Sequence, residues 1–432
     1  MAQISKARRA VIIGGVRTPF IKAFDQFLSL DAIDLSVRAV NALIDRFALE
    51  KSCVDSIVWG GVILPSASPN VGREVVLDIG LPHHVDAMTV TRACASGLQA
   101  VTSAAAAIER GECEVVIAGG ADSTSNGELK MPQKVVQALG PVFMGGKASI
   151  RDYLDAVGKL APFTDILPRV PRIAERSTGQ VMGEAAEEMA RRNEIAREAQ
   201  DAFAVASHTK ASAAWEAGWY DNEVTPMEVD GTRVETDGLV RADTSIEKLA
   251  RLRPIFADGG SVTAGNSSAL TDGAAAVLLM SEDKAKALGY TALSTVRSWS
   301  YVGVDPSDQL LIGPALSMPR ALRKAGLSLK EMDLIDIHEA FAAQVLSVLK
   351  MLKSTGFAKA HLNSSHAVGE VDPAQLNVMG GSLALGHPFA ATGTRMVTSM
   401  SNALVRGDKE FALLGICAAG GLGASAVLQR IH

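Results

Sequence analysis

Short apolar runs alternate with longer alanine-rich, amphipathic stretches along much of this chain. The runs lie at residues 10–15, 56–64, 87–91 and 114–119, and the stretches between them include 31–48 and 96–109. This alternation is typical of a mostly parallel β-sheet covered by helices. We therefore expect an α/β fold.

The alternation begins again after Ser281, which indicates an internal duplication. The second series has strand-like runs at 291–304, 334–337 and 411–416, and helix-like stretches at 318–325 and 340–353. Between the two series, from about Ser123 to Leu249, the sequence is polar and largely helical, most clearly at 180–218. Strand-like sequence returns at 274–280. The pattern predicts two similar halves with a helical insertion in the first.

Composition excludes several classes of protein. With 48% apolar residues in 432, the chain can bury a large core, so wholesale disorder is excluded. A net charge of −5 without a basic tract makes a nucleic-acid partner a poor candidate. The four cysteines (Cys53, Cys94, Cys113 and Cys417) form no C-x-x-C motif, which argues against a disulfide framework and a zinc site. We expect a reduced, cytoplasmic protein without a metal.

One uncharged stretch is formally long enough to span a membrane. Residues 411–428 contain no charge, but they include four glycines, two of them adjacent. A strand, a glycine turn and a second strand fit that composition better than a helix. The N-terminal apolar run is too short and too broken for a signal peptide. We expect no transmembrane segment.

Apolar residues also recur at helical spacing within the insertion. They are Ile150, Tyr153, Leu154, Val157, Leu160 and Ala161, and Pro162, Pro168 and Pro171 follow them. The favoured interpretation is a helix whose apolar stripe packs on its own domain. The alternatives for segment 146–172 are the wall of an acyl-chain tunnel, a partner-subunit surface or a membrane-surface contact.

The first candidate catalytic residue is Cys94, where a strand gives way to a segment of small residues that opens a helix. Unpaired N–H groups and the positive end of the helix dipole favour a thiolate at such a position, so Cys94 could be a nucleophile. The alternative is a core residue, because free cysteine is among the most buried residue types. Cys53 and Cys113 are interpreted as packing residues.

Three further turns carry reactive side chains. His387 lies between Gly386 and Pro388 after a Gly-Gly turn and could accept the proton of a thiol. Cys417 is followed by small residues and glycines, which leave room for a substrate. His338 and Glu339 follow a strand, where a structural pair is the ordinary interpretation. No H-E-x-x-H, P-loop, G-x-S-x-G or dinucleotide-binding motif occurs.

Together and in this order, these motifs resemble the thiolase family over essentially the whole chain. The matching segments are 16–20, the Cys94 block, 119–123, 182–183, 262–268, 272–274, 338–341, 385–388 and the Cys417 block. The strongest likeness is to the beta subunit of the trifunctional fatty-acid oxidation enzyme and its bacterial counterparts. His338 supports this likeness because most thiolases have asparagine there, and residues 305–311 and Ala419 agree. Val181 replaces the histidine usual in biosynthetic relatives.

The resemblance implies a five-layered αβαβα fold from two duplicated halves with an inserted, mainly helical loop domain. The first half would comprise residues 1–124 and 251–285, the loop domain 125–250, and the second half 286–432. It also implies dimers or tetramers of identical chains, and an alpha subunit with hydratase and dehydrogenase activities as a further partner.

The resemblance implies a function for each motif. His387 would activate Cys94 for attack on a 3-ketoacyl-CoA, and Cys417 would protonate the acetyl-CoA enolate. His338, through a water, and the N–H groups of Cys94 and Ala419 would stabilise the oxyanions. Coenzyme A would be a co-substrate, with no permanently bound cofactor. Its pantetheine arm would contact Met182, Phe256, Ala264, Ser268, Leu270, Ala340 and Phe341.

The expected reaction is thiolytic cleavage of 3-ketoacyl-CoA in fatty-acid β-oxidation. The alternative is a biosynthetic thiolase that condenses two acetyl-CoA molecules. A ketosynthase would use two histidines and no second catalytic cysteine, so Cys417 argues against it. A non-catalytic relative would have lost Cys94, His387 or Cys417, and all three are present.

Overall fold

The computed structural model describes residues 8–146, 148–161, 163, 166–167 and 174–432. The chain divides into two compact units, one formed by Met1–Asn126 with Ala174–His432 and the other by Gly127–Ile173. The larger unit holds all the candidate catalytic residues. The domain boundaries predicted at residues 124, 250 and 285 stay predictions.

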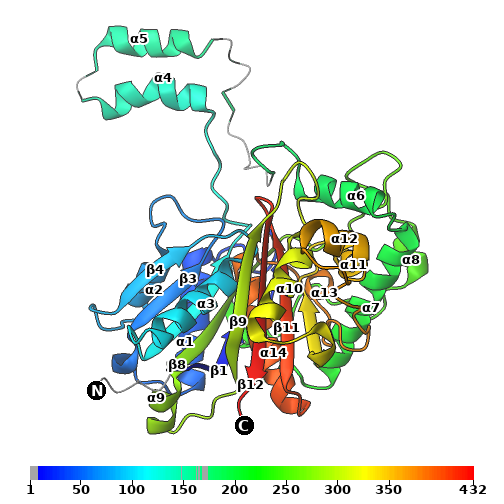
Figure 1. Cartoon of the computed structure of the whole chain (residues 1–432). Helices are drawn as coiled ribbons and strands as arrows, with labels where there is room; N and C mark the ends of the chain where they lie inside the picture. Colours follow the sequence, from blue (N-terminus) through cyan, green and yellow to red (C-terminus); the bar gives the residue numbers. More distant parts are fainter. Residues whose placement is uncertain (1–7, 147, 162, 164–165, 168–173) are drawn as a thin grey trace. The chain divides into compact units, whose positions relative to one another are not determined.

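Strands run side by side through the larger unit (Figure 1). Within the described part of the chain, ten strands form one sheet. They are β1 (Ala10–Arg17), β2 (Ile21–Lys22), β3 (Ser56–Gly60), β4 (Asp86–Val90), β5 (Val115–Asp122), β8 (Thr271–Ser281), β9 (Ser294–Gly303), β10 (Leu334–Ile337), β11 (Phe411–Ala418) and β12 (Leu422–Arg430). A separate hairpin pairs β6 (Met227–Val229) with β7 (Thr232–Val234).

The strand order shows the duplication directly. The first half runs β1-β8-β5-β3-β4, and the second runs β9-β12-β11-β10. In both halves the first three strands are antiparallel neighbours and the next pair is parallel. The halves meet where Ile12 of β1 pairs with Ser294 of β9. The prediction of an α/β fold with two similar halves is confirmed.

Helices cover both halves of the sheet. The larger unit contains α1 (Ala32–Arg46), α2 (Val71–Asp78), α3 (Ser96–Glu109), α6 (Met182–Arg192), α7 (Arg197–Glu216), α8 (Ile246–Ala250), α9 (Glu282–Ala287), α10 (Gly313–Ala325), α11 (Ala342–Leu352), α12 (Thr355–His361), α13 (Ser382–Leu385) and α14 (Ala390–Arg406). Local signals set several of these boundaries. For example, Asp31 accepts the N–H groups of Ile33 and Asp34 and so caps α1.

Alternating side chains place each sheet half between two apolar cores. Val115 and Ile117 of β5 face an outer core shared with α1 and α2. Val116 and Ala118 face a central core shared with α3, α14 and the second-half strands. A third core joins those strands to α10 and α11. The result is five layers, with α3 and α14 in the middle one.

The two central helices cross closely because glycines lie at the contact. A Cβ at Gly97 of α3 would lie 2.2 Å from the carbonyl oxygen of Ala390. A Cβ at Gly393 of α14 would lie 2.5 Å from the backbone nitrogen of Leu98. No larger residue fits at either position without displacing backbone. This crossing matters because Cys94 precedes α3 and His387 precedes α14.

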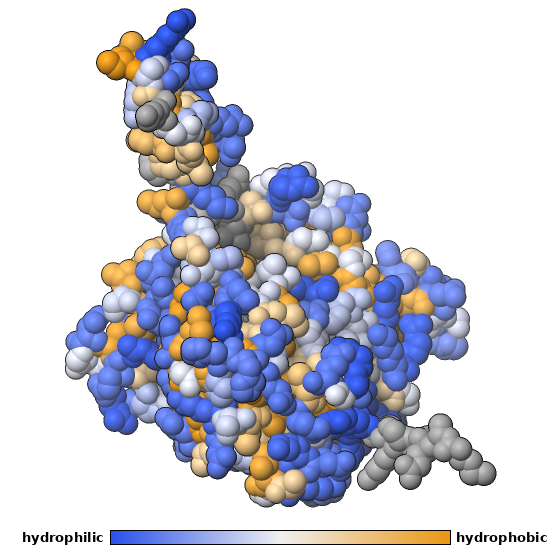
Figure 2. Space-filling view, turned by 90° about the vertical axis from the view of Figure 1, so that its left-hand side faces the viewer, coloured by the Kyte–Doolittle hydropathy of each residue, from blue (hydrophilic) through white to orange (hydrophobic). Residues whose placement is uncertain are grey.

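The uncharged stretch 411–428 forms β11, a glycine turn and β12, as predicted. None of the described helices combines the length and the apolar composition needed to cross a membrane. Figure 2 shows a face on which hydrophilic residues surround small hydrophobic patches.

The smaller unit contains two helices, α4 (Gln133–Met144) and α5 (Ile150–Lys159). Val135, Ala138, Val142 and Ala156 are buried. The apolar stripe on α5 is not buried in the smaller unit, since Ile150 is 81% exposed and Leu154 is 68% exposed. The interpretation that this stripe packs on its own domain, predicted as residues 125–250 and so extending beyond the smaller unit, stays a prediction. Pro162, Pro168 and Pro171 lie outside the described residues, and the three alternatives for segment 146–172 stay predictions.

Candidate active site

Four predicted catalytic side chains come from turns and strand ends in the two halves. Cys94 lies between β4 and α3, and His387 lies just before α14. His338 directly follows β10, and Cys417 lies near the end of β11. Ligand atoms of Cys94, His338 and His387 all lie within 4.8 Å of one another. The fold therefore brings together residues that are up to 293 positions apart (387 − 94).

A strained turn presents Cys94. The preceding residue, Ala93, has φ of 46°, in the left-handed region that non-glycine residues rarely occupy. The hydroxyl of Ser96 accepts the N–H of Arg92 at 2.7 Å and donates to the carbonyl of Ala93 at 2.7 Å. These bonds hold the turn closed around Cys94. The helix itself begins at Ser96, so Cys94 lies just outside it.

Burial decides the protonation state of Cys94. Desolvation raises the pKa of this thiol to about 12, although N–H groups of Ala419 and of Cys94 itself donate to the sulfur and oppose the rise. The nearby Asp122 carboxylate raises it further. The expectation that the helix start favours a thiolate is therefore wrong for the free protein. Cys94 is a thiol at neutral pH and needs a base.

The two histidines form an oriented pair. The Nδ1 atom of His338 lies 3.0 Å from the hydroxyl of Ser382, and Nδ1 of His387 lies 2.7 Å from the hydroxyl of Thr392. The ring centroids are 4.1 Å apart. Both Nε2 atoms are buried without a hydrogen-bond partner. Each ring thus keeps one nitrogen without a hydrogen-bond partner.

Both histidines are neutral at neutral pH. Burial, with a smaller contribution from the Arg395 guanidinium, lowers the pKa of His387 to about 3. Burial, the His387 ring and Arg395 lower the pKa of His338 well below its ordinary value. Arg395 is itself buried and donates to Asp336 at 3.0 Å. A neutral imidazole can accept a proton, which a charged one cannot.

Cys417 and Ala419 approach Cys94 from the second half. Burial and the neighbouring Cys94 raise the pKa of the Cys417 thiol well above its ordinary value. Cys417 is buried, whereas Cys94 is partly exposed. The N–H of Ala419 donates to the Cys94 sulfur and so opposes the effect of burial on the pKa of that thiol.

Glu339 is a structural anchor beneath the site. Its carboxylate accepts from Ser207 at 2.6 Å, from Asn377 at 2.6 Å and from the N–H of Leu383 at 3.2 Å. A Cβ at Gly381 would lie 2.4 Å from this carboxyl group. Glu339 therefore ties α7 to the segment that carries Ser382, the partner of His338.

A second buried carboxylate fixes the start of α14. Asp122 accepts the N–H of Ala390 at 2.8 Å on one oxygen, and the N–H groups of Val62 and Ile63 at 2.9 and 2.6 Å on the other. It acts as a long-range cap for a helix that is distant in sequence. Phe389, just before α14, has φ of 21°, so this strained entry is held by the Asp122 contact.

Most of the predicted coenzyme A residues contact one another, and one of them, Leu270, lies next to His387. The rings of Phe256 and Phe341 meet edge to face with centroids 6.1 Å apart. Met182 and Phe256 pack against a core that contains Ala340 and Phe341. The N–H of Ser268 donates to the carbonyl of Ala340 at 2.9 Å. The backbones of Leu270 and His387 form an isolated parallel β-bridge. Ala264 and Leu270 are exposed, so the outer end of this set faces solvent.

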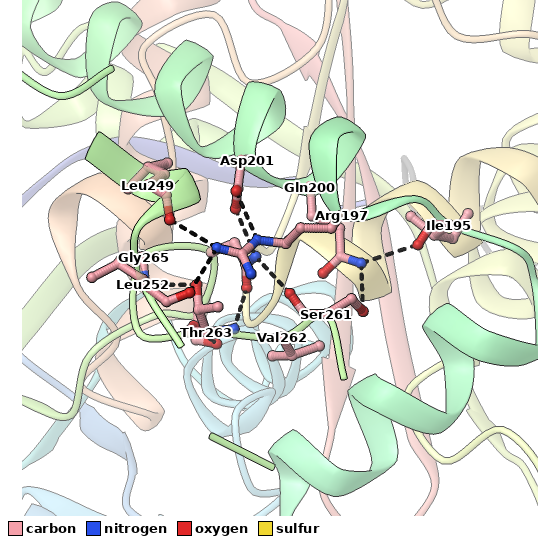
Figure 3. A network of polar contacts seen from close by, with 12 residues as sticks. Ile195, Arg197, Gln200, Asp201, Leu249, Leu252, Ser261, Val262, Thr263 and Gly265 are labelled. Carbon is pink, nitrogen blue, oxygen red and sulfur yellow. Dashed lines mark hydrogen bonds and ion pairs between the residues drawn. The ribbon is translucent and has the colours of Figure 1, made fainter. Parts of the chain in front are cut away.

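A polar network fixes the loop that carries Ala264 and Ser268 (Figure 3). Arg197 donates to the carboxylate of Asp201 at 2.7 Å and to the carbonyls of Leu249 and Leu252 at 2.8 and 3.1 Å. Gln200 donates to the hydroxyl of Ser261 at 2.9 Å. The loop is therefore preorganised by α7.

Several residues around the site were not found from the sequence. Ser382, Thr392, Arg395 and Asp336 orient or polarise the histidines, but nothing in the local pattern distinguishes them. Thr392 lies on α14, a helix that the sequence analysis missed. The one local signal was the spacing of Met396, Met400 and Leu404, at four-residue intervals.

Comparison with known proteins agrees with this arrangement. The family model described as "Thiolase, N-terminal domain" matches residues 10–283, and "Thiolase, C-terminal domain" matches residues 290–430. The chain is 43% identical to a 3-ketoacyl-CoA thiolase of Shewanella amazonensis, over 99% of this chain and 98% of the relative. The chain belongs to the thiolase family.

Two solved structures share the fold. Human mitochondrial 3-ketoacyl-CoA thiolase in complex with CoA superposes with a TM-score of 0.82 at 31% identity, covering 98% of each chain. The Bacillus anthracis acetyl-CoA acetyltransferase superposes with a TM-score of 0.82 at 32% identity, covering 98% of this chain and 99% of the other.

Proposed function

We propose that this thiolase cleaves 3-ketoacyl-CoA with coenzyme A in fatty-acid β-oxidation, giving acetyl-CoA and an acyl-CoA two carbons shorter. The observation that carries the proposal is the grouping of Cys94 with two neutral histidines, whose ligand atoms lie within 4.8 Å of one another, with Cys417 beside Cys94. One thiol can hold the acyl group while the second handles a proton. Relatives named 3-ketoacyl-CoA thiolase at 43–44% identity over nearly the full length support the same reaction.

The reaction begins with His387. Its Nε2 takes the proton of Cys94, and the thiolate attacks the 3-keto carbon of the substrate. Burial destabilises both the Cys94 thiolate and the His387 imidazolium. The proton therefore moves to His387 as the sulfur attacks, and neither ion accumulates before the attack. The hydroxyl of Thr392 at Nδ1 keeps the ring oriented for this transfer.

The carbon–carbon bond then breaks. Its electron pair forms the acetyl-CoA enolate, which takes a proton from Cys417. The acyl group remains on Cys94 as a thioester. The Cys417 thiolate then takes the proton of the coenzyme A thiol, and the coenzyme A sulfur attacks the thioester carbon. The bond from that carbon to the Cys94 sulfur breaks, the shortened acyl-CoA leaves, and His387 returns its proton to Cys94. His387 with a water on His338 stabilises one oxyanion, and the N–H groups of Cys94 and Ala419 stabilise the other. Run in reverse, Cys417 is the base of a Claisen condensation.

The test distinguishes the function of the Cys94 thiol from that of the Cys417 thiol. Cys94→Ala should abolish the acyl-enzyme, measured as a mass increase of the protein after incubation with acyl-CoA. Cys417→Ala should still be acylated but should lose thiolysis by about 10²- to 10⁴-fold, the range for removal of a positioned acid–base group. Cys53→Ala serves as the thiol control with wild-type turnover. Full thiolysis by Cys417→Ala would show that its assigned role is wrong.

A second measurement addresses the biosynthetic alternative. Acetoacetyl-CoA and a 3-ketoacyl-CoA of ten or more carbons are compared as substrates by kcat/KM. The proposal expects the longer substrate to be cleaved efficiently. A strict preference for acetoacetyl-CoA would favour condensation of two acetyl-CoA molecules instead.

Assembly and location form a further part of the proposal. We infer a homodimer or homotetramer, supported by β4, which among the described residues is an edge strand paired with β3 alone and leaves Met88 44% exposed. Co-purification from the native source would test for an alpha subunit with hydratase and dehydrogenase activities. A cytoplasmic location is supported by chemistry that requires two reduced thiols. Size measurement by light scattering would contradict the assembly if it found a monomer.

A further inference from the structure

The site has the ligand chemistry of a metal site as well as that of an acyltransferase. Among the described residues, Cys94, His338 and His387 form a group whose ligand atoms all lie within 4.8 Å of one another. One thiolate and two imidazoles are ligands that zinc binds readily. The spacing of the cysteines in the sequence argued against a zinc site. Spacing can reveal only motifs of neighbouring residues, whereas these three residues come from distant segments of the chain.

The free atoms of the two rings favour the same conclusion. His338 and His387 are buried, and the Nε2 atoms of both have no hydrogen-bond partner. A buried ring nitrogen without a partner is uncommon, because it loses its bond to water without replacement. Both rings belong to the group whose ligand atoms lie close to the Cys94 thiol, and a ring whose Nδ1 donates to its hydroxyl partner has an electron pair on Nε2. A cation can satisfy all three donors at once.

The supporting contacts of a metal site are already present. Metal-binding histidines almost always use their other ring nitrogen in a hydrogen bond, which fixes the ring and its tautomer. Here Nδ1 of His338 is bonded to Ser382 and Nδ1 of His387 to Thr392. Arg395, the buried cation near both rings, is paired with Asp336. Cys94 is partly exposed, which gives an ion a route from solvent.

The distances require only a small adjustment. Zinc binds sulfur at about 2.3 Å and nitrogen at about 2.0–2.1 Å, so its tetrahedral ligands lie about 3.3–3.7 Å from one another. The three ligand atoms lie within 4.8 Å of one another. Side-chain rotations that shorten these separations by about 1 Å would bring them to the distances of a zinc site. Only three protein ligands are present, so the fourth position stays open to water.

We propose that Cys94, His338 and His387 bind one Zn²⁺ reversibly, and that the bound ion blocks the active site. On binding, the Cys94 thiol gives its proton to solvent, and the sulfur and the two Nε2 atoms each donate an electron pair to the ion. Acyl transfer then stops because neither the nucleophile nor the base is free. The inhibition rests on the proposed thiolase function, whereas binding of the ion does not.

His338 provides a variant that tests this inference. An amide is a poor zinc ligand compared with imidazole. His338→Asn therefore removes one ligand and keeps a polar side chain. Cys94→Ser removes the sulfur ligand and keeps nearly the same shape.

The test measures metal binding directly on the reduced, full-length chain. Zn²⁺ is titrated calorimetrically, and Co²⁺ serves as a spectroscopic substitute whose sulfur-to-metal absorption reports a thiolate ligand. We expect one ion per chain with Co²⁺ absorption, and weakening by more than about 100-fold in His338→Asn, beyond the roughly 10–100-fold that outer contacts contribute. Cys94→Ser should lose the absorption. Cys113→Ser, a partly exposed thiol elsewhere, should bind as the wild type does.

Three outcomes would overturn the proposal: no stoichiometric binding by the wild type, binding that survives both ligand variants, or tight binding without inhibition. Thermal unfolding of each variant shows that it is folded. Acyl-CoA labelling of Cys94 in metal-free protein tests the thiolase function separately. If labelling fails while Co²⁺ still binds, the proposed function is wrong and the metal site stands. If labelling succeeds and no ion binds, the metal site is wrong.

Discussion

The two halves of this protein share a strand order but use equivalent strand ends differently. In the first half, β5 ends at Asp122, a carboxylate whose oxygens accept three backbone N–H groups. In the second half, β11 occupies the equivalent place and carries Cys417 one residue before its end, as a thiol beside Cys94. The end of β5 therefore holds backbone segments in place through Asp122, whereas the end of β11 supplies a thiol of the candidate active site.

This difference shows how a duplicated fold builds an asymmetric site. Asp122 does not act on its own half alone, because one of its three bonds reaches Ala390 at the start of α14. The first half therefore positions the helix that follows His387, while the second half provides the histidines. The halves depend on each other through backbone contacts as well as through reacting groups.

The largest expected effect comes from the helix crossing between the halves. Gly97→Ala places a Cβ 2.2 Å from the carbonyl oxygen of Ala390, which neither backbone can avoid without shifting. We expect the free energy of unfolding to fall by about 3 kcal/mol or more, and thiolysis to fall with it because the Cys94 and His387 turns separate. Chemical denaturation and turnover measure the two effects.

A matched helical glycine provides the control. The nearest atom to a Cβ at Gly356 of α12 would be the Ser354 hydroxyl oxygen at 3.7 Å, an ordinary contact. Gly356→Ala should leave turnover unchanged and alter the free energy of unfolding by no more than about 1 kcal/mol. Equal destabilisation by the two substitutions would show that the crossing is not tight.

The next effect tests the strand-end comparison itself. Asp122→Asn keeps the shape but replaces one acceptor oxygen with an NH₂ group, so at least one backbone N–H loses its partner. We expect destabilisation of about 1–3 kcal/mol and a fall in kcat of about tenfold or more through misplacement of His387. Denaturation and acylation rates of Cys94 provide the measurements.

Asp55 is the appropriate control for that substitution. It accepts the N–H groups of Glu114 and Val115 at 2.7 and 2.9 Å, at the start of β5 rather than its end. Asp55→Asn should reduce stability and leave kcat per folded molecule unchanged. If both variants lost stability but kept full kcat, Asp122 would have no positioning role.

The smallest effect concerns the segment inserted only in the first half. His208 of α7 accepts the N–H of Arg241 at 3.2 Å, and burial lowers its pKa to about 4. The folded protein keeps this ring neutral, whereas the unfolded chain binds a proton below about pH 6.5. Its contribution to stability is therefore complete above pH 6.5 and is lost as the pH falls toward 4.

His208→Asn retains an acceptor for Arg241 and removes the titration. Between pH 7 and pH 5, the free energy of unfolding of the wild type should fall by about 1–2 kcal/mol more than that of the variant. Denaturant titrations at both pH values provide the comparison. Identical pH dependence in the two proteins would contradict burial of a neutral His208.

Much of the secondary structure could be predicted because local patterns encode it. The run at 334–337 and the stretch at 96–109 match β10 and α3 at both ends. The strand predicted at 56–64 is too long, since β3 ends at Gly60. The helix predicted at 318–325 is too short, since α10 begins at Gly313. Turn glycines and apolar periodicity are local, so they can be read without the fold.

The missed helix α14 shows where local patterns fail. Thr, Ser and Val are frequent in it, and each has a weak preference for helix. It is also buried on all sides in the central layer, so the amphipathic contrast that identifies surface helices is absent. Packing between the two sheet halves, rather than helix propensity, stabilises it.

The sequence by itself determined the two-half architecture and the turns that carry Cys94, His338, His387 and Cys417, because these depend on residues adjacent in the chain. Only the tertiary structure decided that the four side chains meet, that Cys94 is a thiol and that both imidazoles are neutral. Protonation follows from burial, and burial depends on which distant segments pack over a residue. The same packing leaves one nitrogen of each ring without a hydrogen-bond partner in the group that contains Cys94, which no motif predicted.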